Sequence, residues 1–303
     1  MNIIGVDIGG TKCTIVRADC DGNPQEQRRL VTTTVHETLE GIYSAIEVLQ
    51  PGEKPVFGIA CGGPLDATHG VVLSPPNLPD WNHVEIVSEL TRRFGGQAFL
   101  MNDANACALA EWQFGAGRGA KNVVFLTYGT GMGAGLILDG RLYEGTSGDA
   151  GEVGHIRLAP DGPVGYGKAG SFEGFCSGSG LARLAAGRIL GHPSPNAKEL
   201  AELADGGNPD ALAIWEESSR RLGQALAVIV DVINPEVIIL GSIFARSGRL
   251  LEKGMREVLE KEALPSALKA CRIVPAELGE NTGIMSAIAV AKYHTDKGNK
   301  TGD

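Results

Sequence analysis

The stretch NIIGVDIGGTKCTIVRAD, residues 2–19, decides the fold class. An apolar run meets a glycine pair at Gly9 and Gly10, and a second run with strand-type alternation resumes at Cys13. The glycine loop is therefore expected to join two strands. A Rossmann fingerprint or a P-loop places its glycines between a strand and a helix, and no GxxxxGK(S/T) sequence occurs in the chain. The pattern argues against both of these nucleotide folds.

A second segment, NVVFLTYGTGMGAGLILDG at residues 122–140, repeats the layout of apolar run, glycine turn and apolar run. Aligning Asn2 with Asn122 places Gly9 on Gly129. The repeat predicts a duplicated α/β domain whose two loops face one cleft. Backbone N–H groups in such turns bind anions, and glycine lets a phosphate approach closely. Two such loops in matching places predict a phosphate clamp.

Alternating strands and helices are expected through the rest of the chain. The expected strands lie at 56–59, 98–101 and 237–240, and the expected helices at 86–94, 104–114 and 284–294. A glycine-dense stretch to Gly180 precedes further helices up to Ile233. Residues 115–119 are the expected hinge, which gives an N-terminal domain of residues 1–116 plus 283–303 and a C-terminal domain of residues 117–282. The polar residues 295–303 are expected to be a frayed tail.

Composition and charge exclude several classes of protein. The 303 residues are 43% hydrophobic, and 27 basic against 36 acidic residues give a net charge of -9. This balance argues against broad binding to nucleic acid or to anionic membranes. The apolar stretches are too short to span a bilayer. Six cysteines without paired spacing, and an N-terminus without a signal-peptide pattern, predict a reduced, cytoplasmic protein.

Asp103 is the first candidate catalytic residue. It follows an expected strand and precedes an expected helix in NDANA, residues 102–106. Carboxylates at the carboxyl ends of strands in α/β sheets face the ligand crevice. The alternative is a helix N-cap, since Asp and Asn are good caps. Both roles are compatible if Asn102 or Asn105 caps the helix.

Glu152 and His155 form a second candidate pair in GEVGH, residues 151–155. Their spacing places both side chains on one side of a turn or short helix. A lone histidine is more often structural, but a Glu/His pair among glycines favours polar ligand recognition. Glu173 has a weaker local case, because an isolated glutamate is usually solvated.

Several motifs together resemble the ROK family of bacterial sugar kinases and repressors. They are DIGGTK at 7–12, NDANA at 102–106, YGTGMGAG at 128–135, GEVGH at 151–155, LDGRLYEGTSG at 138–148 and NPEVIILGS at 234–242. The resemblance covers nearly the whole chain. It implies the actin/hexokinase-like (ribonuclease H-like) α/β fold, a duplicated two-domain fold with a central cleft that closes over ATP-Mg²⁺ and a hexose.

The resemblance also implies roles for individual residues. The ATP-binding set would be Asp7, Gly9, Gly10, Thr11 and Lys12 in the first turn, Thr130, Gly131 and Gly133 in the second, and Gly241 beside the adenosine. Asp7 would lie near a hydrated Mg²⁺. The sugar-binding set would be Gly63, Asn77, Asn102, Asp103, Glu152, His155 and Glu173. Asp103 would also be the catalytic base that accepts the proton of the sugar hydroxyl.

The sequence departs from the family pattern in one loop. The family has CxCGxxGCxE after GEVGH, and these three cysteines join the histidine on a structural zinc. This chain has VGYGKAGSFE at 164–173, with Val164, Tyr166 and Ser171 at the cysteine positions. Zinc needs about four ligands, and only His155 is left. We therefore predict no zinc by metal analysis, and a loop held by packing of its aromatic side chains Tyr166, Phe172 and Phe175.

The expected function is that of an ATP-dependent sugar kinase, which transfers the γ-phosphate to a hydroxyl of a hexose such as the 6-hydroxyl of glucose. The alternatives are an N-acetylmannosamine or N-acetylglucosamine kinase, a catalytically inactive sugar sensor, and a transcriptional regulator. ROK repressors carry an N-terminal helix-turn-helix domain, and no basic recognition helix precedes Asp7. The expected partners are the sugar and ATP, with Mg²⁺ as cofactor, no nucleic acid and no membrane. A homodimer is expected from the resemblance.

Overall fold

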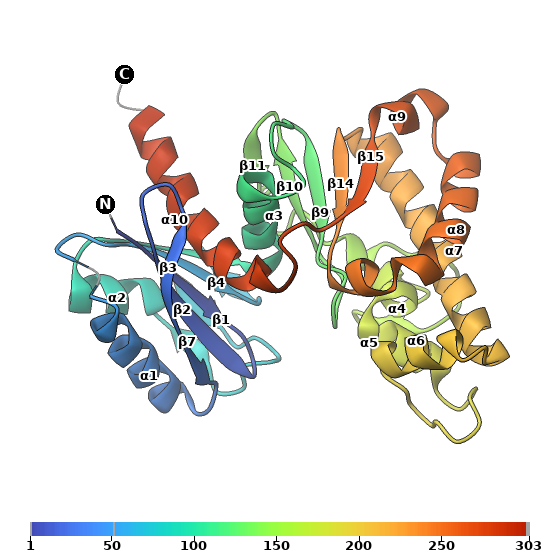
Figure 1. Ribbon diagram of the computed structural model, residues 1–303, viewed down its shortest axis with the longest axis horizontal. Helices are drawn as coiled ribbons and strands as arrows, with labels where there is room; N and C mark the ends of the chain where they lie inside the picture. Colours follow the sequence, from blue (N-terminus) through green and yellow to red (C-terminus); the bar gives the residue numbers. More distant parts are fainter. Residues whose placement is uncertain (1, 51, 301–303) are drawn as a thin grey trace. The chain divides into compact units, whose positions relative to one another are not determined.

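The computed structural model describes residues 2–50 and 52–300, and the side chains of residues 2–50 and 52–296 (Figure 1). The chain divides into two compact units. Unit 1 comprises Met1–Arg118 with Glu280–Asp303, and unit 2 comprises Gly119–Gly279. Within the described ranges, no helix is long and apolar enough to cross a membrane.

Unit 1 is built on a five-stranded sheet. Its strand order is β3 (Pro24–Val31), β2 (Lys12–Ala18), β1 (Ile3–Ile8), β4 (Val56–Cys61) and β8 (Gln97–Asn102). Strand β2 is antiparallel to both of its neighbours, β3 and β1, while β1, β4 and β8 run parallel to one another. Ile8 at the end of β1 pairs with Cys13 on one side and Cys61 on the other. The glycine turn between β1 and β2 therefore joins an antiparallel hairpin, as predicted.

Unit 2 repeats this sheet. Its order is β11 (Arg141–Tyr143), β10 (Ala134–Leu138), β9 (Val123–Leu126), β14 (Val237–Leu240) and β15 (Arg272–Pro275). Again the second strand, β10, is antiparallel to both of its neighbours, and the last three strands run parallel to one another. The two sheets share strand order and direction, which confirms the predicted duplication of an α/β fold.

Among the residues that the structure describes, four helices belong to unit 1. They are α1 (Val35–Val48), α2 (Ile86–Phe94), α3 (Asp103–Phe114) and α10 (Thr282–Lys300), and a small sheet is formed by β5 (Leu65–Asp66), β6 (Val71–Leu73) and β7 (Asn82–Val84). Helix α10 packs directly on the sheet, because a Cβ atom at Gly5 of β1 would lie 3.1 Å from that of Ala287.

The expectation of a frayed tail from residue 295 is wrong as far as the chain is described, since α10 continues to Lys300. The Thr295 hydroxyl donates to the Ala291 carbonyl at 2.7 Å, and the Lys292 ammonium lies 3.6 Å from the Asp296 carboxylate. These contacts between successive turns support the polar end of the helix. Residues 301–303 lie outside the described residues.

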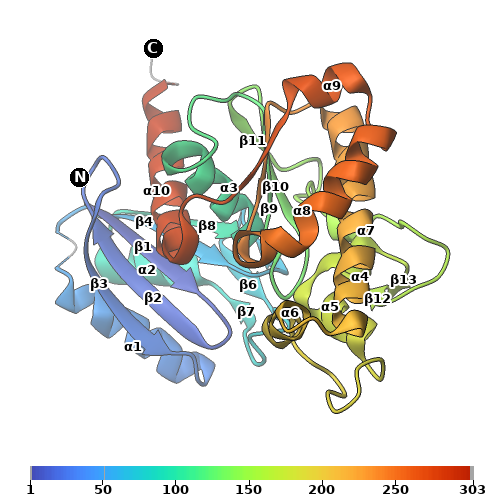
Figure 2. The same cartoon turned by 45° about the vertical axis from the view of Figure 1, so that its right-hand side comes forward.

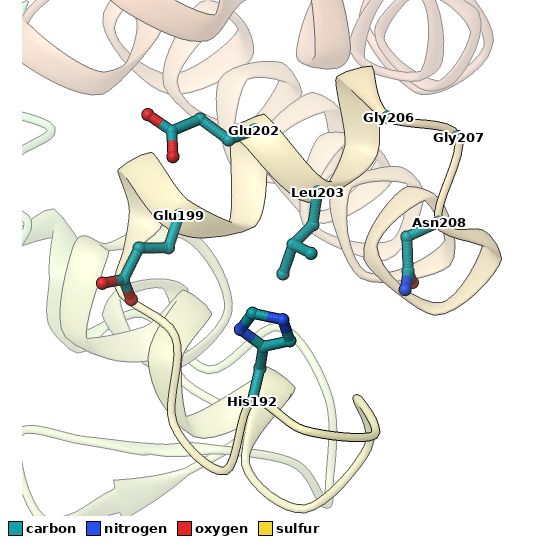
Figure 3. Close-up of a pocket in the computed structure, with 7 residues that line it drawn as sticks. All are labelled: His192, Glu199, Glu202, Leu203, Gly206, Gly207 and Asn208. Atoms are coloured by element: carbon teal, nitrogen blue, oxygen red, sulfur yellow. The ribbon is translucent and has the colours of Figure 1, made fainter.

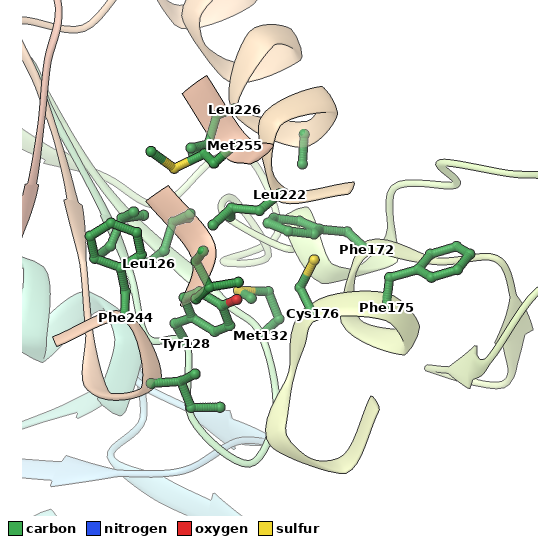
Figure 4. Packing of buried hydrophobic residues seen from close by; sticks show 14 of the residues in the cluster. Leu126, Tyr128, Met132, Phe172, Phe175, Cys176, Leu222, Leu226, Phe244 and Met255 are labelled. Carbon is green, nitrogen blue, oxygen red and sulfur yellow. The ribbon is translucent and has the colours of Figure 1, made fainter. Parts of the chain in front are cut away.

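Unit 2 carries its helices on a single large core. They are α4 (Phe172–Cys176), α5 (Gly178–Ala185), α6 (Ala197–Asp205), α7 (Pro209–Ile233), α8 (Ser242–Glu262) and α9 (Pro265–Ala270), with a 3-10 turn at Val153–His155. A further 3-10 turn, Gly279–Asn281, spans the boundary between the two units in the sequence. Figure 2 shows α7 and α8 side by side. Figure 4 shows how Phe172 and Cys176 of α4 meet Leu222 of α7 and Tyr128 in the core. The core therefore holds Tyr128 and Met132, on either side of the second glycine turn, and Phe172, next to Glu173.

The glycine-dense stretch before Gly180 holds more regular structure than its sequence indicates. It contains α4 and a hairpin of β12 (Val164–Gly165) and β13 (Lys168–Ala169). The Ser171 side chain caps α4 by accepting from the Gly174 N–H at 3.1 Å. The first α-helix of this unit therefore begins at Phe172, before the position expected from the sequence.

Candidate functional site

The first glycine turn presents backbone N–H groups. The Gly9 N–H donates to the Lys12 carbonyl at 3.1 Å, and Thr32 binds the turn through its hydroxyl, which donates to the Gly9 carbonyl at 2.6 Å. The N–H groups of Gly10 and Thr11 have no partner among the described residues. Unpaired N–H groups in a tight turn attract anions. The turn can therefore bind a phosphate oxygen.

The second turn has the same property. The Met132 N–H donates to the Glu173 carboxylate at 3.1 Å, and the Gly133 N–H donates to a threonine hydroxyl at 3.0 Å. The N–H groups of Thr130 and Gly131 have no partner in the part of the chain that the structure describes.

The match between the two turns extends to individual backbone atoms. The alignment of Asn2 with Asn122 places Gly10 on Thr130 and Thr11 on Gly131, the residues whose N–H groups are unpaired. The duplication therefore preserves the same pair of potential anion donors in each unit.

Two helices begin at the second turn. The Ile243 N–H at the start of α8 donates to the Tyr128 carbonyl at 2.9 Å, and the Gly178 N–H at the start of α5 donates to the Gly129 carbonyl at 2.8 Å. Gly241 precedes α8, and a Cβ atom there would lie 2.5 Å from the Thr127 carbonyl oxygen. Only glycine permits this close approach between the end of β14 and the turn.

These helices and α6 line a hollow of about 660 Å³ on unit 2. A hollow of this volume is within the usual range for a small-molecule site. Of the expected ATP-binding residues of unit 2, Thr130 lines it, while Gly131, Gly133 and Gly241 do not. Sequence reasoning missed several polar lining residues: Ser179, Asn196, Lys198, Asp205, Arg246 and Arg249.

Two ion pairs lie in the lining of this hollow. The Arg249 Nε lies 3.1 Å from an Asp205 carboxylate oxygen, which ties α8 to α6. The Lys198 ammonium lies 3.8 Å from the Glu202 carboxylate, one turn along α6. The pair of Asp205 and Arg249 could not be predicted from a local pattern, because the two residues are separated by 44 positions in the sequence.

Asn102 and Asp103 both accept a hydrogen bond at the start of α3. Asn102 is the N-cap of α3, and its side-chain oxygen accepts from the Ala104 N–H at 2.9 Å. Asp103 is the first residue of the helix, its side chain is exposed, and one carboxylate oxygen also accepts from the Ala104 N–H at 2.8 Å. The cap thus exists without Asp103.

The loop after β4 lies beside these residues. A Cβ atom at Gly62 would lie 3.9 Å from the Asp103 carboxylate, and one at Gly63 would lie 3.3 Å from the Asn102 amide. Strands β4 and β8 are parallel neighbours that end together, with Cys61 opposite Asn102. The carboxyl ends of two strands therefore present Gly63, Asn102 and Asp103 together, in the usual position of a ligand site.

Asp7 adds a second carboxylate to unit 1. Burial is the main cause that raises the pKa of this group from 3.8 to about 6, followed by the negative charge of Asp103, while Lys12 lowers it. The Asp7 side chain lies against Gly283 in the first turn of α10, where a Cβ atom would collide with it. Two mutually repelling carboxylates fit a hard cation such as Mg²⁺, which takes oxygen ligands.

Asn77 also lies near the first turn. A Cβ atom at Gly10 would lie 2.8 Å from the Asn77 Cβ and would collide with its carbonyl oxygen. The loop that carries this asparagine therefore packs on the first glycine turn of the same unit.

The expected sugar-binding residues of unit 2 meet around Gly154. A Cβ atom there would collide with the Met132 carbonyl oxygen and lie 3.3 Å from the Glu173 Cβ. Glu152 and His155 are exposed on either side of this glycine. Glu173 is half-buried, and its hydrogen bond to Met132 places it on the second glycine turn. The structure thus brings the GEVGH segment, Glu173 and this turn together.

The loop at 164–173 does not fit a zinc site. Its Ser171 hydroxyl donates to the Gly165 carbonyl at 3.1 Å, and Val164 and Tyr166 offer no zinc-binding atom of the usual kind. In the described part of the chain, no group of three or more His, Cys, Asp or Glu side chains is placed to hold a metal. Phe172 and Phe175 are buried in the core, whereas Tyr166 is 47% exposed.

Another hollow, of about 550 Å³, lies beside α6 (Figure 3). Its lining residues are His192, Glu199, Glu202, Leu203, Gly206, Gly207 and Asn208. Glu199 accepts from the Asn196 N–H at 2.9 Å in a capping box, and Asn208 caps α7. None of the expected site residues lines this hollow, and two of its polar side chains serve helix ends.

Comparisons with known proteins show the family of this chain. The model of the ROK family matches residues 3–294. The chain is 34% identical to a glucokinase of Thermotoga maritima, over 96% of this chain and 98% of that protein. It is 31% identical to an N-acetylmannosamine kinase of Citrobacter koseri, over 96% and 99% of the two chains.

A solved structure gives the same result for the fold. It is a ROK family glucokinase from Streptomyces griseus in complex with glucose and AMPPNP, with a TM-score of 0.76 and 31% identity over 95% of this chain and 98% of that chain. This likeness confirms the actin/hexokinase-like fold. The chain belongs to the ROK family.

Proposed function

We propose that this protein is an ATP-dependent hexose kinase that transfers the γ-phosphate to the 6-hydroxyl of glucose or a related hexose. The observation that carries the proposal is the matched pair of unpaired N–H groups in the two turns, at Gly10 and Thr11 and at Thr130 and Gly131. Relatives named glucokinase support the kinase class. Phosphoryl transfer depends mainly on positioning and charge neutralisation, which such turns provide.

The ATP side of the proposal uses both turns. Gly9, Gly10, Thr11 and Lys12 would bind phosphates in unit 1, and Thr130, Gly131 and Gly133 in unit 2, with Gly241 allowing the approach of α8. The adenosine would occupy the hollow between α5, α6 and α8. Asp7 would lie near a hydrated Mg²⁺, which when bound neutralises phosphate charge.

The acceptor side places Asp103 as general base. Its exposed carboxylate at the end of β8 would orient the sugar hydroxyl and take its proton. The other sugar ligands would be Gly63, Asn77, Asn102, Glu152, His155 and Glu173. Glu173 would also hold the second turn, through the hydrogen bond to Met132. A homodimer stays a prediction.

Two other functions remain to be separated from this one. The likeness to an N-acetylmannosamine kinase supports an N-acetylhexosamine as the acceptor. A sugar sensor would bind ATP or sugar without turnover. One assay of turnover across a panel of sugars distinguishes both from a hexose kinase.

The test is ADP release with ATP-Mg²⁺ across a panel of hexoses and N-acetylhexosamines, comparing the wild type with Asp103→Asn. We expect the variant to lose about 10²- to 10⁴-fold in kcat while the sugar KM changes little. Asp210→Asn is the matched control, because Asp210 is an exposed aspartate in the first turn of α7.

Each outcome assigns a function. Turnover on a hexose that Asp103→Asn abolishes supports the proposal. Turnover confined to N-acetylhexosamines assigns the alternative substrate class. Bound ATP without turnover on any sugar contradicts the kinase, and equal losses in kcat and sugar affinity would reduce Asp103 to a binding role.

A further inference from the structure

The hairpin β12–β13 ends in a tight turn. Val164 pairs with Ala169 and Gly165 with Lys168, so that Tyr166 and Gly167 form a two-residue turn. Their φ angles are 53° and 67°, and two positive values favour the type I′ turn that matches the twist of a hairpin. The turn therefore sets where Tyr166 is presented.

The base of the hairpin is fixed by hydrogen bonds. Buried Ser171 donates to the Gly165 carbonyl at 3.1 Å, and Arg157 donates to the Ala169 carbonyl at 2.8 Å. The Gly170 N–H donates to the Pro163 carbonyl at 3.1 Å. Each strand is thus tied to residues outside the hairpin ladder.

Two side chains reach from this hairpin to His155. The Lys168 ammonium donates to the His155 carbonyl at 2.8 Å. The Tyr166 ring lies edge-on to the imidazole, with 5.6 Å between the ring centroids and 88° between the planes. This is a favourable geometry for an aromatic pair. Gly154 makes room for it, because a Cβ atom there would lie 3.1 Å from the Tyr166 ring.

The imidazole depends on this contact for its orientation. Neither ring nitrogen of His155 has a hydrogen-bond partner among the described residues, and the side chain is exposed. A ring held by neither a hydrogen bond nor burial is oriented by whatever ring or chain packs beside it. Here that neighbour is Tyr166.

We propose that Tyr166 and Lys168 are positioning residues that hold His155 ready to bind a sugar hydroxyl. Lys168 fixes the backbone of the histidine, and Tyr166 fixes the plane of its ring, leaving both nitrogens open to the ligand. The inference rests on the proposed function, because it assigns His155 to the sugar. It makes the hairpin a metal-free support for the sugar site.

The test separates ring orientation from general stability. Tyr166→Ala and Tyr166→Leu remove the aromatic ring, and Tyr166→Phe retains it. We expect the first two to raise the sugar KM about three- to tenfold, with ATP KM unchanged, and Tyr166→Phe to restore it to within about twofold of wild type. Lys168→Met should raise the sugar KM as well, and Lys168→Arg should restore it.

A second readout does not need activity. The imidazole proton signal of His155, assigned by its loss in His155→Gln, should move in Tyr166→Leu because the ring current of Tyr166 is gone. An unchanged signal together with an unchanged sugar KM would overturn the inference, as would equal changes in ATP and sugar KM. If the wild type phosphorylates no sugar, the proposed function fails, while the signal still tests the contact.

Discussion

Asp7→Asn should stabilise the protein near neutral pH although it removes a carboxylate that we assign to the ATP site. Burial and the charge of Asp103 raise the pKa of Asp7 from 3.8 to about 6. The folded protein therefore keeps a proton that the unfolded chain releases between these two values. Wild-type stability falls as pH rises through this window, and asparagine has no such titration.

The magnitude follows from the two pKa values. At about 1.4 kcal/mol for each pH unit between them, ionised Asp7 costs about 3 kcal/mol at pH 8, and about half of that cost is present at pH 5. The free energy difference between Asp7→Asn and wild type should therefore grow by about 1.5 kcal/mol from pH 5 to pH 8.

The assay is urea unfolding at a series of pH values, without Mg²⁺ or nucleotide. Glu53→Gln is the control, because Glu53 is an exposed carboxylate of the same unit. The reasoning is refuted if Asp7→Asn destabilises the protein at pH 8, or if its effect is the same at pH 5 and pH 8.

Two further substitutions test the packing around Gly154 and Ser171 of unit 2, with the free energy of unfolding measured by heat or urea. Gly154→Ala should lower the free energy of unfolding by about 1–3 kcal/mol, because the new Cβ would collide with the Met132 carbonyl. Gly248→Ala is the control, because its Cβ would make only ordinary contacts and should leave the stability unchanged or raise it. Equal effects of the two substitutions would contradict this reasoning. Ser171→Ala should lose about 1–2 kcal/mol with its cap and buried hydrogen bonds, and an unchanged stability would show that the hairpin is held otherwise.

Local sequence patterns predicted the main elements of the fold. The helix expected at 86–94 and the strand expected at 237–240 have these bounds in the structure. The two glycine hairpins were predictable because apolar alternation and a glycine turn are read within one short segment. The match between two such segments was enough to indicate the duplicated sheets.

The hairpin at 164–169 and helix α4 could not be read in the same way. Their residues are rich in glycine and have no clear period, so their structure depends on distant contacts. Ser171 bonds back to Gly165, and Phe172 is buried in the core with residues of α7. The packing hypothesis for the loop was incomplete, because it included no role for the Ser171 hydroxyl.

In the candidate site, too, residues within a local pattern could be predicted, whereas contacts between distant segments could not. Asp103 and Asn102 could be singled out from their place between a strand and a helix, although only the structure identifies Asn102 as the cap. The hydrogen bond from Met132 to Glu173 spans 41 residues of sequence. The lining of the hollow beside the second turn comes from three helices, and no local pattern joins them.

The position of α10 has a consequence for how the protein is made. This helix covers β1 and β4 of unit 1, yet it follows the whole of unit 2 in the chain. During synthesis the ribosome releases all of unit 2, a continuous segment, before the helix that completes unit 1 emerges. Domains generally fold as units during translation. Unit 2 can therefore fold first, while β1 and β4, which carry Asp7 and pack on α10, stay uncovered until that helix has been translated.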